Sequence, residues 1–228
     1  EAISAIHRRN RVPIVVGGTG FYLRALLDGL SPAPSRNPAV RLRLTNVAAR
    51  RPGVLHRFLR ARDPEAANRI HFNDRQKLIR AIELILLARQ PVTTIQSLPR
   101  DALRGVRALK FGLIPPRAVL YQHLDRRSAQ MFSNGLLTET KALLDSGVSP
   151  FPKPLQSLGY KQAADVLTRR SQIGDAIREC QAKTRQYAKR QMTWFRAEAG
   201  VHWLRGFGAD NAIKEEAIKA TEKFLQSF

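Results

Sequence analysis

The stretch Val12-Pro13-Ile14-Val15-Val16-Gly17-Gly18-Thr19-Gly20 decides the fold class. Its first five residues form an almost continuous β-branched run, which is typical of a strand covered on both faces in a parallel α/β sheet. The glycines that follow are typical of a tight turn from a strand into a helix, and that helix should begin near Phe21. The stretch therefore predicts an α/β fold built around a parallel sheet.

Two further segments have the composition of strands, residues 107–114 (RALKFGLI) and residues 201–204 (VHWL). Helical sequence separates each strand from the next, which is the alternation of a βαβ fold. Three strands are few for such a sheet, and residues 1–10 resemble the end of an amphipathic helix that runs directly into the first strand. We therefore expect the N-terminal strands to be missing, so that this chain is the C-terminal part of a larger α/β protein.

Residues 35–99, between the first two strands, contain no strand signal. Asn-Pro and Asp-Pro pairs predict helices at about 38–50 and 64–70, and Asn73 with Gln76 has the form of a capping box before a helix at 74–89. We expect an all-helical insertion domain at 35–99, within an α/β core formed by residues 1–34 and 100–228. Further helices are predicted at 116–146, 156–167, 172–196 and 211–226.

The composition is strongly basic, because 39 Lys and Arg against 18 Asp and Glu give a net charge of +21 over 228 residues. The planar guanidinium of arginine suits phosphate groups, so the charge predicts a nucleic-acid partner. A hydrophobic fraction of 43% supports a folded protein, and no run approaches the roughly 20 apolar residues of a membrane span. The single cysteine, Cys180, excludes an internal disulfide and a multi-thiolate zinc site, which indicates a reducing, cytoplasmic location.

Two patterns in the first half of the chain could carry chemistry. The glycine turn with the Thr19 hydroxyl could bind an anion, or it could be a tight turn that packs Tyr22 onto the sheet. On the helix predicted at 74–89, Gln76 and Arg80 share a face with Glu83. That face could contact base edges or phosphates, or it could simply be solvated.

Three patterns lie in the second half. Arg126 and Arg127 stand on one predicted helix, where a lone arginine is commonly a surface residue. In 156–161, Tyr160 could stack on a base, or the segment could be an ordinary helix start. In 184–196, Arg185, Lys189 and Arg196 form a basic stripe with Thr193, and the face bearing Tyr187, Gln191 and Trp194 is expected to pack inward; the stripe could grip a phosphate backbone or be solvated.

Taken in order, four segments resemble the bacterial tRNA dimethylallyltransferases over essentially the whole chain: 13–27 (PIVVGGTGFYLRALL), 71–76 (HFNDRQ), 158–160 (LGY) and 184–194 (TRQYAKRQMTW). The resemblance implies an α/β core related to P-loop kinases that carries a helical insertion. It also implies transfer of a dimethylallyl group from dimethylallyl diphosphate to the exocyclic amine of the adenosine 3′ to the tRNA anticodon. That base would be flipped into a channel, with magnesium at the diphosphate. A monomer without membrane attachment is expected.

Matched positions imply roles for individual residues. Thr19 would act near the flipped adenosine, and Arg127 would stabilise charge on the leaving diphosphate, so both are candidate catalytic residues. Arg41 and three segments would contact the tRNA anticodon stem-loop. The candidate tRNA-binding residues in those segments are Arg75, Gln76, Lys77, Arg80, Gln156, Gly159, Tyr160, Lys161, Lys189, Arg190, Gln191, Thr193, Trp194 and Arg196. No residue of the chain is a candidate metal ligand.

The chain also departs from the family pattern. The phosphate loop G-P-T-x-x-G-K-T and the D-S-x-Q carboxylate proposed as a base are absent, and Asp145-Ser146 does not replace the latter. Phe72 and Arg75 stand where the family usually has prolines, and Gln156 stands where relatives often have Arg. We therefore expect residues 1–228 alone to be inactive in prenyl transfer, and magnesium to bind mainly through the missing segment and the diphosphate.

Two other functions stay open on the sequence. One is a stand-alone basic RNA-binding module without catalytic activity. The other is a fragment of a metabolic P-loop kinase, which would have no need of so large a positive charge.

Overall fold

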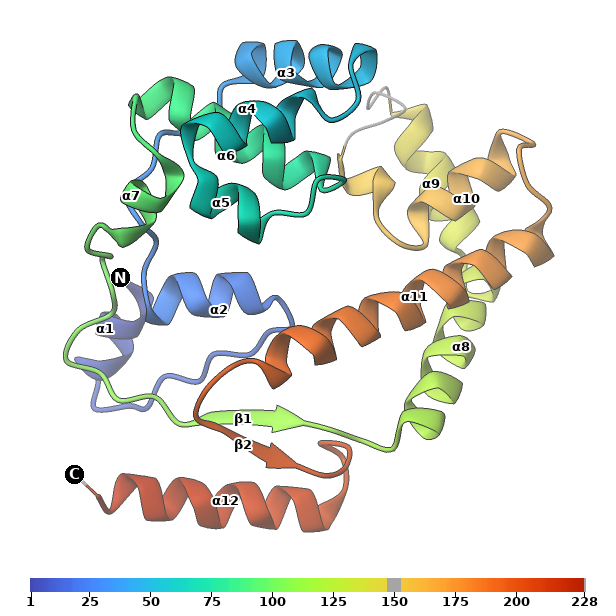
Figure 1. Ribbon diagram of the computed structural model, residues 1–228. Coiled ribbons are helices and arrows are strands. Elements are labelled where there is room, and N and C mark those ends of the chain that lie inside the picture. Colours follow the sequence, from blue (N-terminus) through green and yellow to red (C-terminus); the bar gives the residue numbers. More distant parts are fainter. Residues whose placement is uncertain (147–152, 228) are drawn as a thin grey trace. The chain divides into compact units, whose positions relative to one another are not determined.

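The computed structural model describes residues 1–146 and 153–227. The chain divides into two compact units, unit 1 formed by Glu1–Gly20 with Arg107–Phe228, and unit 2 formed by Phe21–Val106. Helix α2 (Gly20–Leu27) begins at the boundary between them (Figure 1). The helical insertion predicted at 35–99 lies within unit 2. None of the described helices combines the length and the apolar character needed to cross a bilayer.

The sheet of unit 1 consists of β1 (Lys110–Leu113) and β2 (Val201–Leu204), which run parallel with Lys110 opposite Val201 and Leu113 opposite Leu204. Parallel strands need a long crossover, and here a run of helices from α8 to α11 supplies it (Figure 1). Both strands lie where the sequence predicts them, and their parallel pairing agrees with the predicted α/β class. Helix α12 (Asn211–Leu225) packs against β2 and buries Ile213.

The strand predicted at 12–16 is wrong. Residues 11–17 have no regular secondary structure, and the described sheet contains only β1 and β2. Ile14 is 84% exposed and Val16 is 90% exposed, so the β-branched run is not buried. A strand forms only where a neighbouring strand accepts its hydrogen bonds, and no described strand pairs with this segment.

The helices of unit 1 confirm most predicted positions but not all boundaries. They are α1 (Ala2–His7), α8 (Arg117–Ser133), α9 (Leu136–Asp145), the 3₁₀ turn η1 (Lys153–Gln156), α10 (Tyr160–Leu167), α11 (Ile173–Arg196) and α12. The single helix predicted at 116–146 is split, because Gly135 has a φ of 101° and ends the helical path. Likewise α10 begins only at Tyr160, after Gly159 with a φ of 95°. Phe132, Leu136, Ala163, Ala176 and Cys180 form the core of these helices.

Unit 2 is entirely helical in its described elements after α2. It contains α3 (Pro38–Arg50), α4 (Val54–Arg62), α5 (Pro64–Arg69), α6 (Arg75–Ala88) and α7 (Val92–Ser97). The sequence predicted α3, α5 and α6 but not the shorter α4 and α7, which bury Leu59 and Ile95 in the common core. The predicted capping box at Asn73 is also wrong. Asp74 is the N-cap of α6, and its Oδ1 accepts the Lys77 N–H at 3.1 Å.

Candidate nucleic-acid interface

The glycine-rich loop, residues 17–20, lies against the C-terminal half of α11 in unit 1. The Nε2 of Gln191 donates a hydrogen bond to the carbonyl oxygen of Gly18 at 2.7 Å, which joins residues 173 positions apart. The indole of Trp194, about one turn further along α11, lies directly against the buried Gly20. The loop and the 184–196 segment, which the sequence presents as separate patterns, therefore form one structure.

Two glycines of this loop lie close against side chains of α11. A Cβ atom on Gly20 would lie 1.9 Å from Cε3 of Trp194, and a Cβ on Gly18 would lie 2.3 Å from Nε2 of Gln191. Carbon atoms pack at about 3.5–4.0 Å, so a Cβ at position 20 would clash with the indole ring, whereas a Cβ at position 18 would meet only the far end of the flexible Gln191 side chain. By contrast, a Cβ on Gly17 would meet no atom within 4 Å. The glycine pattern is thus explained by packing at Gly18 and Gly20.

Thr19 is exposed on this loop, between the two glycines that α11 holds. Its candidate catalytic role stays a prediction, but its position is fixed on both sides. Gln191 and Trp194 are candidate tRNA-binding residues, yet in this structure both are half-buried and support the loop from below. We conclude that these two side chains position Thr19, whatever else they contact.

Helices α8 and α11 pack together through polar as well as apolar contacts. Arg185 donates to Oδ1 of Asp125 at 2.5 Å, and the Nε2 of Gln181 donates to the Asp125 carbonyl oxygen at 3.0 Å. Arg185 therefore does not belong to the free basic stripe expected from the sequence. Arg126 and Arg127 follow immediately on α8 with exposed side chains, and within the described residues Arg127 has no ion pair.

The exposed part of α11 is nevertheless basic. Lys189, Arg190 and Arg196 are exposed, and Thr193 donates its hydroxyl to the Lys189 carbonyl oxygen at 2.9 Å. Tyr187 is 42% exposed, with the Arg190 guanidinium 5.7 Å from its ring centroid, so the expectation that it packs inward is wrong. Helices α8 and α11 together carry nine Lys and Arg against three Asp and Glu. This excess favours a polyanion at their surface.

The segment at 156–161 is tied to neighbouring carboxylates. Tyr160 donates its hydroxyl to Oε1 of Glu139 at 2.6 Å, and this bond raises the pKa of the phenol. Lys161 pairs with Asp165 at 2.9 Å, which raises the pKa of the ammonium group. Gly159 is buried against Met131, while Gln156 is exposed. The Tyr160 hydroxyl and the Lys161 ammonium group are thus held by partners within unit 1, and the Tyr160 side chain is half-buried.

In unit 2, the start of α6 and a buried carboxylate organise the candidate residues. Arg75, Gln76 and Lys77 are exposed, and Lys77 pairs with the capping Asp74 at 2.9 Å. Arg41 and Arg80, by contrast, both donate to Oε2 of Glu83, at 3.2 and 2.8 Å. The sequence placed Glu83 on a polar face that could be solvated; in the structure its side chain is fully buried. In the sequence, the sign of this cluster is a single glutamate, Glu83, among the apolar residues of α6.

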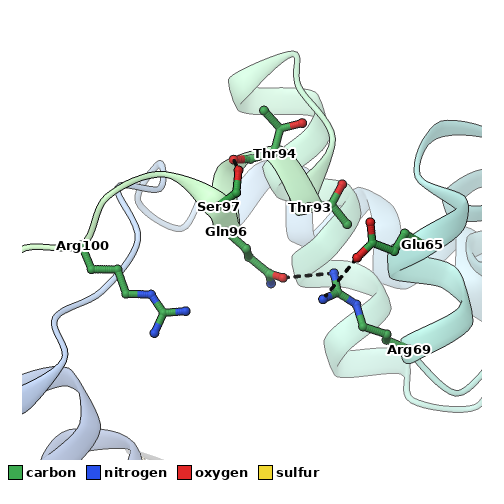
Figure 2. Close-up of a pocket in the computed structure, with 7 residues that line it drawn as sticks. All are labelled: Glu65, Arg69, Thr93, Thr94, Gln96, Ser97 and Arg100. Atoms are coloured by element: carbon green, nitrogen blue, oxygen red, sulfur yellow. Dashed lines mark hydrogen bonds and ion pairs between the residues drawn. The ribbon is translucent and has the colours of Figure 1, made fainter.

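A pocket of about 520 Å³ that the sequence did not indicate lies beside α7. Figure 2 shows the side chains that line it: Glu65, Arg69, Thr93, Thr94, Gln96, Ser97 and Arg100. Several of their polar groups bind one another, since Arg69 contacts both Glu65 and Gln96 and Ser97 donates to the Thr94 carbonyl oxygen. The pocket is therefore a polar recess stabilised by its own contacts.

A bound metal ion needs a cluster of side chains that can coordinate it. Within residues 1–146 and 153–227, no group of three or more His, Cys, Asp or Glu side chains could hold a metal ion. Magnesium prefers carboxylate oxygens and phosphates. The described residues therefore contain no preformed cluster of protein ligands for magnesium.

Comparison with known proteins gives a consistent result. The profile of the IPP transferase family matches residues 1–198. A tRNA dimethylallyltransferase of Solibacter usitatus is 49% identical over 225 residues, which are 99% of this chain and 73% of that protein. A tRNA dimethylallyltransferase of Koribacter versatilis is 49% identical over 220 residues, 96% of this chain and 71% of that protein.

Solved structures agree. The tRNA isopentenylpyrophosphate transferase of Bacillus halodurans has a TM-score of 0.60 at 32% identity, over 99% of this chain and 69% of that one. A eukaryotic dimethylallyltransferase described as acting on tRNA has a TM-score of 0.75 at 26% identity, over 99% of this chain and 60% of that one. These likenesses confirm the resemblance and the fold class that the sequence indicates. The chain belongs to the IPP transferase family.

Proposed function

We propose that this protein is a tRNA dimethylallyltransferase, which transfers a dimethylallyl group from dimethylallyl diphosphate to the exocyclic amine of the adenosine 3′ to the anticodon. Membership of the IPP transferase family and the names of the relatives support this activity. The proposed partners are the tRNA anticodon stem-loop and dimethylallyl diphosphate. A monomer in the cytoplasm is part of the same proposal, and the buried, unpaired thiol of Cys180 agrees with a reducing compartment.

The observation that carries the proposal is the junction of the glycine-rich loop with α11. Gln191 and Trp194 hold the loop on either side of Thr19, while Lys189 and Arg196 of the same helix remain exposed. The helix that holds the loop bearing Thr19 therefore also carries cations that can bind the RNA backbone. A base that is flipped out of its stack needs both a fixed pocket and a grip on neighbouring phosphates, because extrusion costs a few kcal/mol.

Within this proposal, Thr19 contacts the adenosine and Arg127 contacts the diphosphate. Arg127 suits the second role because its guanidinium is exposed and makes no ion pair among the described residues. A guanidinium fork binds phosphate oxygens and would stabilise the charge that develops on the leaving group. We also propose magnesium at the diphosphate, but the described residues supply no carboxylate cluster for it, so we assign it no step.

The proposed roles are tested by separating binding from transfer. A chain extended to the length of its relatives should add a dimethylallyl group to unmodified tRNA, detected by mass spectrometry of the released nucleosides. Arg127→Ala should reduce the rate of transfer far more than the affinity for tRNA. Arg126→Ala is the matched control, since it removes the same charge from the neighbouring position on α8. Equal losses of transfer and binding in Arg127→Ala would make that residue a tRNA contact, and no transfer by wild-type protein would contradict the activity.

A further inference from the structure

A buried carboxylate holds two arginines from different helices in unit 2. Glu83 of α6 is fully buried, and its Oε1 accepts the backbone N–H of Asn37 at 2.7 Å. Its Oε2 accepts Nη1 of Arg41 from α3 at 3.2 Å and Nη1 of Arg80 from α6 at 2.8 Å. A second nitrogen of Arg80 donates to the Pro34 carbonyl oxygen at 2.9 Å. The cluster of Glu83, Arg41 and Arg80 is therefore rigidly connected on its buried side.

The charge of this cluster is not balanced. One carboxylate faces two guanidinium groups, which leaves one positive charge in excess. Burial alone would raise the pKa of Glu83, but hydrogen bonds from Arg80, the Asn37 N–H and Arg41 outweigh it and hold the pKa below its ordinary value. Glu83 is thus ionised at neutral pH. Its negative charge offsets one of the two guanidinium charges, and one positive charge remains.

Both arginine side chains are partly exposed to solvent. The side chains of Arg41 and Arg80 are 30% and 32% exposed. Each guanidinium has five N–H groups. Within the described part of the chain, Arg41 makes one of the hydrogen bonds named above and Arg80 makes two, so most of their N–H groups remain available to a ligand. Both Nη1 atoms bind the same oxygen, so they lie at most 6.0 Å apart, the sum of 3.2 and 2.8 Å. Two oxygens of one phosphate, each accepting at about 2.8 Å, can span such a separation.

We propose that Glu83 is a positioning residue, which fixes Arg41 and Arg80 so that their outer N–H groups bind one phosphate of the RNA backbone. The inference rests on the proposed function for its substrate class and adds how the helical unit holds that substrate. Fixing a guanidinium in advance lowers the entropy lost on binding, because a free arginine side chain must be ordered first. Phosphate contacts set the register of the RNA without reading its bases.

Glu83→Gln tests the proposal by whether it strengthens or weakens RNA binding. The substitution removes a negative charge from a basic protein, so general electrostatics predicts tighter RNA binding. The proposal predicts the opposite: affinity for a tRNA anticodon stem-loop about tenfold weaker, the loss expected for one misplaced charge-assisted contact. The matched control is Glu65→Gln, which removes the same charge from an exposed Glu–Arg pair of unit 2. The control should bind the stem-loop at least as tightly as wild type.

A salt series gives an independent measure. The double variant Arg41→Gln with Arg80→Gln should lower the slope of log affinity against log salt by about 0.7 to 0.9, which corresponds to one phosphate. Glu83→Gln should lower the slope by a similar amount although it keeps both positive charges. A purely structural role for Glu83 would change thermal stability and leave the slope of the folded protein unchanged. Circular dichroism fixes the folded fraction of each variant.

If Glu83→Gln does not fold, Arg41→Lys and Arg80→Lys decide the question. Each keeps the charge but loses the planar fork, so each should weaken binding by several-fold without removing a charge. Glu83→Gln binding as tightly as wild type, or lysine variants that bind normally, would overturn the proposal. All these variants should lose equal affinity for stem-loops with and without adenosine 3′ to the anticodon. Failure of the proposed function would appear instead as no adenosine preference in the wild-type protein.

Discussion

Gly20→Ala places a methyl group where the indole of Trp194 now lies. The new Cβ would be 1.9 Å from Cε3 and 2.0 Å from Cζ3 of that ring. Since carbon atoms pack at about 3.5–4.0 Å, the ring or the loop must move by about 1.6–2.1 Å. Overpacking of this kind costs about 1–3 kcal/mol of unfolding free energy. Alanine gains up to about 1 kcal/mol of helix propensity at the start of α2, which only partly offsets the clash.

Two neighbouring glycines provide matched controls. Gly18→Ala meets the far end of the flexible Gln191 side chain, so it should cost only the Gln191–Gly18 hydrogen bond, about 0.5–1.5 kcal/mol. Gly17→Ala meets no atom within 4 Å and should change stability by no more than about 0.5 kcal/mol. Urea unfolding followed by circular dichroism measures all three. Equal stability of Gly20→Ala and Gly17→Ala would refute the packing of the loop on α11.

Three further predictions concern single residues. Gly135→Ala should cost about 1–2 kcal/mol in urea unfolding because the positive φ between α8 and α9 is unfavourable for a residue with a Cβ, even though no atom lies within 4 Å; an unchanged midpoint would contradict the split of the predicted helix. Burial raises the pKa of Asp63, but hydrogen bonds from Ala66 and Thr93 outweigh it and leave the pKa below the ordinary value of 3.8. The stabilisation that ionised Asp63 contributes is therefore fully present above the ordinary pKa and is lost as pH falls through the lower folded pKa. The unfolding free energy should accordingly decline below about pH 4 in wild type and less steeply in Asp63→Asn. Arg185→Gln should reduce stability by about 1 kcal/mol or less and leave the salt dependence of RNA binding unchanged, since Arg185 is committed to Asp125 in a half-exposed pair; a lower salt slope would return Arg185 to the RNA-binding surface.

Local sequence signals predicted the elements that depend on local chemistry. The Asn-Pro and Asp-Pro pairs located the starts of α3 and α5, where Asn37 and Asp63 accept capping hydrogen bonds. The strands at 110–113 and 201–204 fall inside the predicted segments. The run at 12–16 failed because β-branched composition indicates a strand only when another strand is available to pair with it. Helices α4 and α7 were missed because packing on α6 and α5, rather than any cap, stabilises them.

In the candidate site, too, local signals located some residues, whereas contacts between residues distant in sequence could not be predicted. Exposed cations such as Lys189 and Arg196 remain where helical spacing placed them. The partners that fix the other residues lie far away in sequence: Gln191 is 173 residues from Gly18, and Arg41 is 42 residues from Glu83. No periodicity within one helix reports such contacts. For this reason the sequence identified Arg41 and Arg80 as candidates and placed Glu83 on the face of Arg80, but it could not indicate that Arg41 of another helix binds the same carboxylate.

The most direct test of the central claim is binding of this chain to a tRNA anticodon stem-loop with adenosine, or another base, 3′ to the anticodon. Both ligands are titrated over the same salt series, so that phosphate contacts and base recognition are measured separately. The proposed function predicts tighter binding of the adenosine ligand at every salt concentration, with equal slopes for the two. Steep salt dependence with no preference for adenosine would contradict the claim. The chain would then be a basic protein that binds only the phosphate backbone of the RNA.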